Sequence, residues 1–322
     1  MTNLALSVPP RRTEEVMEEA RDHGVYDDSR SVRRPGDSVE VPVTRPFGGY
    51  TVVEQDEPVR RRVSLDDFVD DPPPYSLVGD VALVRFDGAD EERERAVADA
   101  LEEHHGVRTV LEDLGVEGET RVPETRHVAG DRDTETVHRE NEFEFALDPS
   151  SVMFSVGNAE ERVRMRETVE DDETVFDMFA GIGYFAVPCA VGGAQVVAAE
   201  KRRAAHVYLV ENARRNGVSD SLDAHYSDCR DVEVDGKADR VVMGHFESAR
   251  DDFLTHAFDS VGSEGVLHVH DAVHEEAKEE TVRAVTEAAR RHGYEAETRV
   301  RRVKGYAEGV AHVVVDARVS RG

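Results

Sequence analysis

The chain has 322 residues, of which 39% are hydrophobic and 34% charged, so it is long enough for two or three domains with a full core. No apolar run approaches the roughly 18 residues that cross a bilayer, and the first residues lack the apolar segment of a signal peptide. Two cysteines exclude a disulfide scaffold, and no C-x-x-C motif for zinc is present. We therefore expect a cytoplasmic protein.

The charge is strongly acidic: 40 basic residues against 69 acidic ones give a net charge of −29. A disordered acidic protein is one interpretation, but the apolar periodicity described below argues against it. The composition indicates instead a halophilic protein adapted to high intracellular salt, where the Debye length falls to roughly 3 Å and self-repulsion is screened. Since contacts in strong salt act only at short range, the acidic total does not exclude a nucleic-acid partner.

Residues 1–74 form a polar N-terminal segment that ends in a linker. Thr13 to His23 predicts a short helix that Gly24 ends. Residues 37–47 predict a strand that Pro46 stops. The run from Asp70 to Pro74 contains three prolines, which neither a helix nor a central strand accepts, and it is therefore the predicted linker.

Residues 75–150 predict a small α+β module. A strand over 77–86 is followed by a charged helix from Glu91 to His105, and short strands are expected over 107–113, 121–130 and 135–148. Four basic or histidine side chains here precede the last segment with little acid between them, so this module is expected to position RNA. The candidates are Arg121, Arg126, His138 and Arg139.

Residues 151–322 alternate strands and helices. Strands are predicted over 174–179, 194–200, 223–228, 238–244 and 265–270, with helices after the first, over 201–216 and over 277–293. This alternation predicts an α/β, Rossmann-like domain with a parallel sheet and helices on both faces. Two late strands, 294–303 and 309–319, predict an antiparallel edge.

Two glycines follow the first strand of this alternating region. Gly181 and Gly183 allow a tight turn and a close approach of a ligand to the main chain. Glu200, 17 residues after Gly183, ends the second strand and is placed to accept hydrogen bonds from both ribose hydroxyls of a nucleoside. Asp228 ends the third strand, where an adenine amino group would lie.

Asp177, just before the glycines, helps to choose the ligand. A dinucleotide fingerprint would tolerate Ala186 at its third glycine position, but Asp177 would repel a pyrophosphate. An acidic residue there suits a cation better, and S-adenosylmethionine carries an ammonium and a sulfonium. A plain glycine turn without ligand is the alternative.

A family resemblance rests on these residues: D177-MFAGIGYF, Glu200, Y226-SDCRD and A238-DRVVMG. Between about Tyr75 and His274 the chain resembles the class I S-adenosylmethionine enzymes that modify position 37 of tRNA. Two sister groups share this body, the guanosine-37 N1-methyltransferases and the wybutosine-synthesising aminocarboxypropyltransferases.

The sisters differ after the fourth strand. The methyltransferases carry Asn-Leu-Pro or Asn-Pro-Pro there, whereas this chain has Gly244 and His245, similar to the aminocarboxypropyl group. The segment from Met153 to Asn158 and the IGYF sequence also resemble that group, while H138-REN is more similar to the methyltransferases. The resemblance thus implies transfer of the 3-amino-3-carboxypropyl group to carbon 7 of 4-demethylwyosine in tRNA-Phe. N1-methylation and an inactive tRNA-binding module are the alternatives.

The resemblance also implies roles for particular residues. Ser155 and Arg162 would hold the polar tail of the donor, Glu200 its ribose, and Asp228 with Cys229 its adenine edge, while Asp177, Phe179, Gly181 and Gly183 complete the donor site. Glu161 matches the general base of the methyltransferases, and Gly244 with His245 would shape the acceptor side. The alternatives give these residues no part in function: Glu161 and Arg162 would be exposed charges on a helix, and Ser155 would be a helix cap.

Three further features compete for a function. His268, His270 and His274 have metal-like spacing, but a packed histidine pair is the preferred interpretation and no metal is expected. Cys189 is expected in the core. Arg301, Arg302 and Lys304 form a small basic cluster that could contact phosphate, but a solvated edge strand is the default interpretation.

Overall fold

The computed structural model describes residues 3–55, 64–234, 237–246, 249, 251–274, 277–307 and 309–322. These residues divide into two compact units, Met1–Asp71 and Pro72–Gly322, with the boundary inside the proline-rich run. Within the described residues, no helix combines the length and the apolar character that a membrane span requires.

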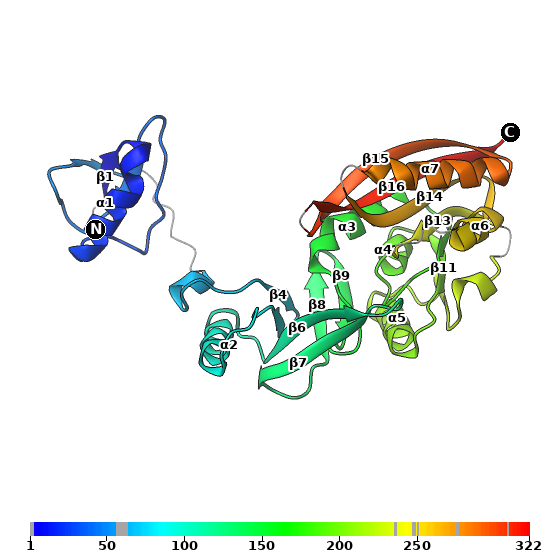
Figure 1. The fold of residues 1–322 in the computed structure, drawn as a ribbon, viewed down its shortest axis with the longest axis horizontal. Helices are drawn as coiled ribbons and strands as arrows, with labels where there is room; N and C mark the ends of the chain where they lie inside the picture. Colours follow the sequence, from blue (N-terminus) through cyan, green and yellow to red (C-terminus); the bar gives the residue numbers. More distant parts are fainter. Residues whose placement is uncertain are drawn as a thin grey trace. The chain divides into compact units, whose positions relative to one another are not determined.

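The first unit, blue in Figure 1, is a small sheet covered by one helix. Strands β1 (Leu4–Val8), β2 (Val39–Pro42) and β3 (Thr51–Glu54) pair in the antiparallel order β2-β1-β3. Helix α1 (Thr13–Asp22) confirms the predicted helix and buries Val16 and Ala20 against the sheet. The short turn η1 (Pro10–Arg12) precedes this helix, and η2 (Leu65–Asp67) follows the last strand of the unit. The strands β1 and β3 were not predicted.

The second unit begins with a four-stranded sheet in the order β4-β5-β6-β7. It comprises β4 (Tyr75–Val78), β5 (Val81–Val84), α2 (Glu91–His105), β6 (Thr109–Glu117) and β7 (Val122–Gly130). The single strand predicted over 77–86 is wrong: it is a hairpin, because Gly79 adopts a φ of +58° and turns the chain. The hairpin of β8 (Thr136–Glu140) and β9 (Phe143–Leu147) follows.

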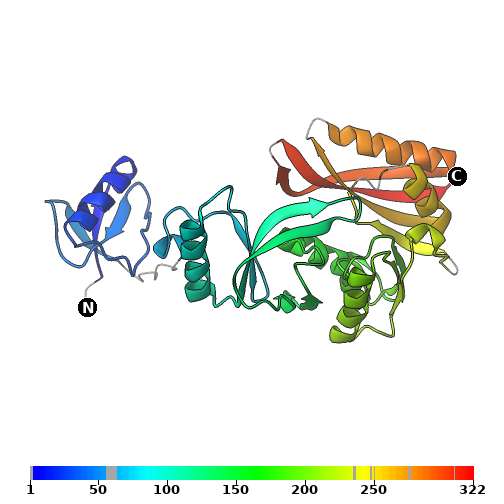
Figure 2. The same ribbon diagram turned by 60° about the horizontal axis from the view of Figure 1, so that its bottom comes forward.

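The β6–β7 hairpin extends from this sheet toward the last part of the chain, as Figures 1 and 2 show. At its tip the Glu119 carboxylate lies 3.0 Å from the Lys201 ammonium, and the Glu119 carbonyl lies 2.9 Å from Nε2 of His245. The tip is therefore held at the ends of two strands of the large sheet.

The large sheet has seven strands in the order β12-β11-β10-β13-β14-β16-β15. The strands are β10 (Thr174–Asp177), β11 (Gln195–Ala199), β12 (Leu222–His225), β13 (Ala238–Met243), β14 (Val261–His274), β15 (Tyr294–Ala307) and β16 (Val310–Arg321). The first five in that order pair in parallel, and β16 lies antiparallel between β14 and β15, which confirms the predicted Rossmann-like sheet and its antiparallel edge.

Helices cover both faces of this sheet. One face packs against α3 (Ala159–Thr168), α4 (Ala186–Val191) and α5 (Arg203–Arg215), and the other against α6 (Asp251–Ser260) and α7 (Lys278–Arg291), while η3 (Val156–Asn158) and η4 (Cys229–Asp231) are single turns. Alternation along β10 sends Val175 to the first face and Phe176 to the second. Helix α6 was not predicted, and α3 was anticipated only by the alternative that placed Glu161 and Arg162 on a helix.

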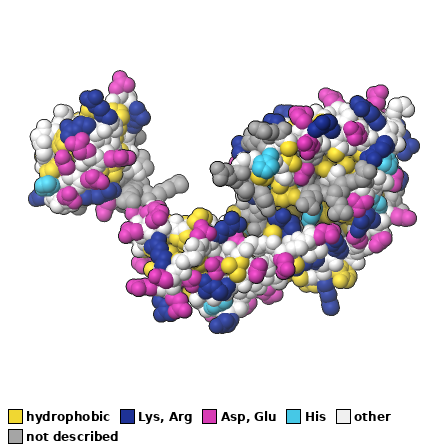
Figure 3. Space-filling model, in the orientation of Figure 1, with side chains coloured by type: hydrophobic (Ala, Val, Ile, Leu, Met, Phe, Trp, Pro, Cys, Tyr) yellow, Lys and Arg dark blue, Asp and Glu magenta, His cyan; other side chains and the backbone are white. Residues whose placement is uncertain are grey.

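The acidic side chains are distributed over the surface. On the face shown in Figure 3, Asp and Glu side chains are interspersed with Lys and Arg over both units rather than gathered in one patch.

A buried asparagine joins the small hairpin to the sheet layers. Asn212 of α5 accepts a hydrogen bond from the Ala146 amide of β9 at 2.7 Å and donates to the carbonyls of Ala146 at 3.1 Å and Ile182 at 2.8 Å. One fully buried side chain thus satisfies three backbone groups and connects β9 with the glycine turn after β10.

We expect Asn212→Ala to lower the free energy of unfolding by about 2–4 kcal/mol, because three buried backbone groups lose their partner. Urea unfolding followed by circular dichroism measures this. Val210→Ala, an exposed change on the same helix, is the control and should stay within about 0.5 kcal/mol. Equal stability of the two variants would contradict the bridging role.

Candidate active site

A pocket of about 790 Å³ lies at the carboxyl ends of the parallel strands. Its walls come from the glycine turn after β10, the ends of β11 and β13, the segment 152–158, the β6–β7 hairpin and the β15–β16 edge. Ligands of open α/β sheets bind at this edge, so the position alone marks a candidate site.

Gly181 and Ile182 of the glycine turn line the pocket, whereas Gly183, which was expected to complete the donor site, is not among the lining residues. Gly181 has a φ of +57° and Gly183 a φ of +100°, which L side chains rarely adopt. A Cβ at Gly183 would also come within 2.7 Å of Val187 and 3.3 Å of Leu209. The turn can therefore approach α4 and α5 only with glycine there.

Glu200 is fixed by two main-chain amides. Its carboxylate accepts hydrogen bonds from the Gly181 amide at 3.0 Å and the Arg202 amide at 2.6 Å, and it lines the pocket. Burial raises the pKa of Glu200 above its ordinary value in spite of these bonds. The geometry predicted from the sequence, an acid beside the glycine turn, is present.

Asp177 lies beneath the turn and is absent from the pocket lining. One carboxylate oxygen accepts a hydrogen bond from the Phe179 amide at 3.2 Å, and the other has no hydrogen-bond partner among the described residues. Complete burial raises the pKa of Asp177 to about 7. Asp177 therefore supports the turn from below, while the neighbouring Phe179 reaches the pocket wall.

Asp228 and Cys229 line the pocket at the end of β12. Asp228 accepts hydrogen bonds from the Arg230 amide and guanidinium at 3.1 and 2.8 Å, which hold the pKa of its carboxyl well below its usual range. Cys229 is buried, and burial raises the pKa of its thiol to about 12. The thiol therefore stays protonated.

Ser155 faces the pocket at the start of η3. Its side chain makes no helix-capping hydrogen bond; its Oγ accepts instead from Nζ of Lys304 at 2.6 Å. Its amide donates to the Tyr184 hydroxyl at 2.7 Å, and this hydroxyl donates to the Met153 carbonyl at 2.9 Å. The residue after Gly183 thus holds the Ser155 segment in place.

Arg162 is not in the pocket, contrary to the role implied by the resemblance. It is fully buried, pairs with both carboxylate oxygens of Glu140 and donates to the Ser155 carbonyl at 3.1 Å. The rings of Phe154 and Tyr184 lie 4.8 and 5.4 Å from its guanidinium carbon. Arg162 therefore supports the Ser155 segment from behind and is not an exposed helix charge either.

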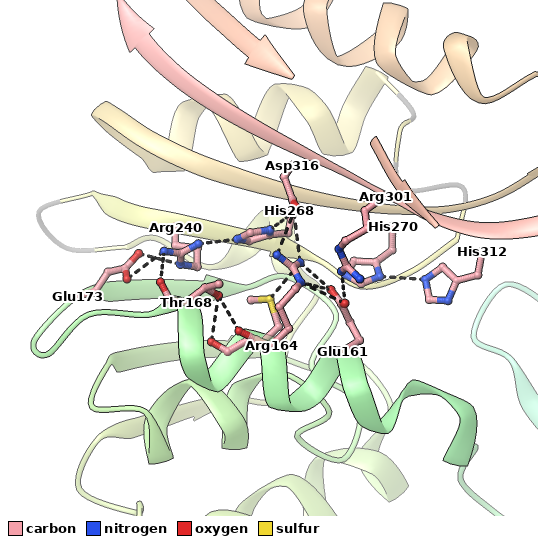
Figure 4. Close-up of polar contacts among 11 residues, drawn as sticks. Glu161, Arg164, Thr168, Glu173, Arg240, His268, His270, Arg301, His312 and Asp316 are labelled. Carbon is pink, nitrogen blue, oxygen red and sulfur yellow. Dashed lines mark hydrogen bonds and ion pairs between the residues drawn. The ribbon is translucent and has the colours of Figure 1, made fainter. Parts of the chain in front are cut away.

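Glu161 is likewise buried and does not line the pocket. Figure 4 shows it pointing from α3 toward the edge strands, where it pairs with Arg301 of β15 and with Arg164 at 2.6 Å. From Arg164 the network continues to Asp316, and His268 lies between Asp316 and Arg240. The position matching a general base is thus a structural ion pair in this chain.

The histidines predicted as a packed pair join different partners. His270 contacts the ring of His312 at 3.0 Å between nitrogens, and His268 contacts Asp316 and Arg240. Within the described part of the chain, no group of three or more His, Cys, Asp and Glu side chains is arranged to hold a metal ion. Cys189 is buried in the core, as expected.

The four RNA candidates are scattered. Arg121 lines the pocket, with its guanidinium carbon 5.2 Å from the centre of the Phe246 ring. Arg126 pairs with Glu94 and Glu112, Arg139 with Glu144, and His138 contacts the Gly79 amide and Glu140. The carboxylates that pair with Arg126 come from distant parts of the chain, and the partner of Arg139 lies on the neighbouring strand β9. Of the four candidates, Arg121 alone lines the pocket.

Gly244 and His245 both line the pocket, as predicted. Phe185 and Lys304 are among the wall residues to which the sequence interpretation gave no role in the pocket. Phe185 lies just after Tyr184 and the glycines, and it entered the sequence interpretation only as the last residue of the IGYF sequence. Lys304 is 149 residues from its partner Ser155, a distance at which no local pattern signals contact. It lies on an edge strand, as expected, but the expectation that its side chain is solvated is wrong.

The sequence of this chain matches known protein families and named relatives. The family model described as the TRM5/TYW2 methyltransferase domain matches residues 136–297, and the TYW2 N-terminal domain matches residues 61–134. The tRNA(Phe) (4-demethylwyosine(37)-C(7)) aminocarboxypropyltransferase of Pyrococcus horikoshii is 41% identical over 54% of this chain and 63% of its own length. The tRNA (guanine(37)-N(1))-methyltransferase Trm5b of Pyrococcus abyssi is 34% identical over 79% of each chain.

Solved structures agree with this. The crystal structure of wild-type Trm5b from Pyrococcus abyssi has a TM-score of 0.73 at 31% identity and covers 99% of this chain and 100% of its own. The Methanocaldococcus jannaschii TYW2 structure in complex with AdoMet has a TM-score of 0.62 at 33% identity and covers 77% of this chain and 100% of its own. With its glycine turn, acid-lined pocket and antiparallel edge, the chain belongs to the TRM5/TYW2 methyltransferase domain family.

Proposed function

We propose that this protein transfers the 3-amino-3-carboxypropyl group of S-adenosylmethionine to carbon 7 of 4-demethylwyosine at position 37 of tRNA-Phe. Relatives from Pyrococcus horikoshii and Methanocaldococcus jannaschii carry this activity in their names, and solved TYW2 structures contain AdoMet or MeSAdo. The match to the first of these spans 63% of its length, so activity, substrate and partner remain part of the proposal.

The contact between Gly244 and Phe185 carries the choice between the sister reactions. A Cβ at position 244 would lie 2.8 and 3.0 Å from two carbons of the Phe185 ring, closer than real Cβ atoms come. Phe185 therefore occupies the space that an asparagine side chain would need after β13. This contact disfavours the methyltransferase-type loop, which resemblance associates with Asn followed by Leu-Pro or Pro-Pro.

The pocket side chains then take distinct roles. Glu200 accepts from the ribose hydroxyls, and Asp228 with Cys229 lies at the adenine edge. We assign the tail to Ser155, Gly181 and Tyr184, which line the pocket. Orientation in the pocket selects which of the three sulfonium carbons meets the base, and such positioning is worth several kcal/mol.

The proposed step is a substitution at the tail carbon next to sulfur. Carbon 7 of the base forms the new carbon–carbon bond while the carbon–sulfur bond breaks, and its electron pair stays on sulfur. Neutral methylthioadenosine leaves, and carbon 7 loses its proton. The buried Glu161–Arg301 pair does not reach the pocket, so we assign that proton to no side chain of α3.

The tRNA contact is proposed at the mouth of the pocket. Arg121, at the tip of the β6–β7 hairpin, is the candidate for the anticodon loop, and residues 75–150 act as the module that positions the RNA against the transferase domain over 151–322. No role is proposed for residues 1–74. We also propose that the enzyme works in the cytoplasm at high salt, because its charge of −29 needs screening.

Guanosine-37 N1-methylation is the second candidate. It is supported by the Trm5b relative, whose alignment covers 79% of this chain. The two reactions release different parts of the donor, which makes them separable in one experiment.

The donor should be labelled in the methyl carbon in one sample and in the carboxyl carbon in another, and incubated with the enzyme and tRNA-Phe that carries 4-demethylwyosine. We expect carboxyl label in the tRNA and methyl label in methylthioadenosine. Methyl label in the tRNA would replace our first proposal by the second, whether the tRNA carries 4-demethylwyosine or guanosine at position 37.

Gly244→Ala should lower stability by about 1–3 kcal/mol through overpacking against Phe185 and reduce transfer at saturating donor. Thermal unfolding and initial rates measure the two effects. Gly262→Ala is the matched control, because its Cβ would meet its nearest atom at an ordinary 3.4 Å. If Gly244→Ala behaved like the control, the steric account of the acceptor wall would be wrong.

Glu200→Ala should weaken S-adenosylmethionine binding by about 1–3 kcal/mol, because the ribose hydroxyls lose their acceptor. Calorimetry measures this, with the exposed Glu264→Ala as control. Only the ionised carboxylate accepts from both hydroxyls, and the pKa of Glu200 is raised. Lowering the pH should therefore weaken the binding of S-adenosylmethionine to the wild type. This loss should begin at a higher pH than it would for a glutamate of ordinary pKa.

Burial also raises the pKa of Asp177, to about 7, so the comparison of wild type with Glu200→Gln isolates the contribution of Glu200 to the pH dependence. This variant should retain a weaker pH dependence. An unchanged pH profile in Glu200→Gln would show that Glu200 does not contact the ribose.

A further inference from the structure

Lys304 of β15 reaches into the pocket from the antiparallel edge of the sheet. Its ammonium donates to Oγ of Ser155 at 2.6 Å. A Cβ on Gly157 would lie 3.1 Å from Nζ and 3.2 Å from Cδ of this lysine. The glycine thus leaves room for the lysine side chain beside the Ser155 segment.

The charges around Lys304 are of the same sign as its own. Among the described residues, no carboxylate forms an ion pair with its ammonium. Burial and the nearby Arg162 and Arg121 guanidiniums lower the pKa of Lys304. Arg162 has its own counter-charge in Glu140. Because the half-buried Lys304 ammonium lies near other cations, binding of an anion beside it would be electrostatically favourable.

The acids of the pocket do not supply that anion. Each of the four that line its described walls has other partners: Asp113 has Arg85, Glu119 has Lys201, Asp228 has Arg230, and Glu200 has the amides of Gly181 and Arg202. The counter-charge of Lys304 is therefore expected from a ligand.

One turn connects the ribose acid to the lysine. The Gly181 amide donates to Glu200, and three residues later the Tyr184 hydroxyl binds the Met153 carbonyl and the Ser155 amide. A nucleoside whose ribose lies on Glu200 can therefore extend a short tail across the turn to Ser155 and Lys304. An anionic group at the end of that tail would meet the ammonium.

We propose that Lys304, seated against Ser155, binds the carboxylate of the donor's aminocarboxypropyl tail and fixes the tail for transfer. This inference rests on the proposed function and deepens it. The ammonium retains donors after its bond to Ser155, and a carboxylate can accept from them at short distance. Arg162, which the resemblance suggested for this carboxylate, is already occupied by Glu140.

The test compares two donors on three proteins by calorimetry. S-adenosylmethionine carries the carboxylate, and decarboxylated S-adenosylmethionine lacks it. Wild type should prefer the former, and Lys304→Met should lose about 10- to 100-fold of affinity for it, as expected for a hydrogen bond between charged groups. Affinity of the variant for the decarboxylated donor should stay within about twofold of wild type, so that the preference disappears. Lys278→Met, the same charge change at the exposed start of α7, should change neither value.

Three results would overturn the inference. Unchanged affinity of Lys304→Met for S-adenosylmethionine would show that the lysine does not bind the donor. Equal loss for both donors would show a structural effect. Loss of tRNA affinity alone, measured on the same variant by filter binding, would assign Lys304 to an RNA phosphate. Failure of wild type itself to bind S-adenosylmethionine would instead overturn the proposed function, and so the two failures are distinguishable.

Discussion

The short turn between Gly181 and Tyr184 is the constraint on which the rest of the site depends. Positive φ angles at both glycines and the close approach of Val187 and Leu209 to Gly183 leave the chain little choice of path. Along that path one amide meets Glu200 and one hydroxyl meets the Ser155 segment. Two walls of the pocket, one from β11 and one from residues before α3, are thus positioned by four consecutive residues.

Buried ion pairs of α3 fix the other side of this arrangement. Arg162 and Glu161 are 0% and 1% exposed, yet each has its charge balanced, by Glu140 and by Arg164 with Arg301. Removing one partner of such a pair leaves an uncompensated buried charge, which costs far more than an exposed pair contributes. These residues therefore hold α3 against the hairpin of β8 and β9 and against the sheet edge. They do not line the pocket themselves, whereas the nearby Ser155 and Lys304 do.

The sequence was sufficient where the chemistry is local. Glycines at a strand end, an acid at the next strand end and the alternation of strands and helices predicted the turn, Glu200 and the sheet with its antiparallel edge. It was insufficient where distant charges meet. Arg126 is indistinguishable from an RNA-binding arginine until the folded chain brings Glu94 and Glu112 to it, and Lys304 became a pocket residue only because β15 is the neighbour of β16 at the sheet edge.

The central claim is that this turn orients the donor with its ribose on Glu200 and its tail toward Ser155. A crystal structure of the protein with S-adenosylmethionine tests it most directly. The account predicts ribose hydroxyls within hydrogen-bond distance of the Glu200 carboxylate and the amino-acid end of the donor beside Ser155. Density that placed the nucleoside away from Glu200, or the tail on the opposite side of the turn, would contradict it.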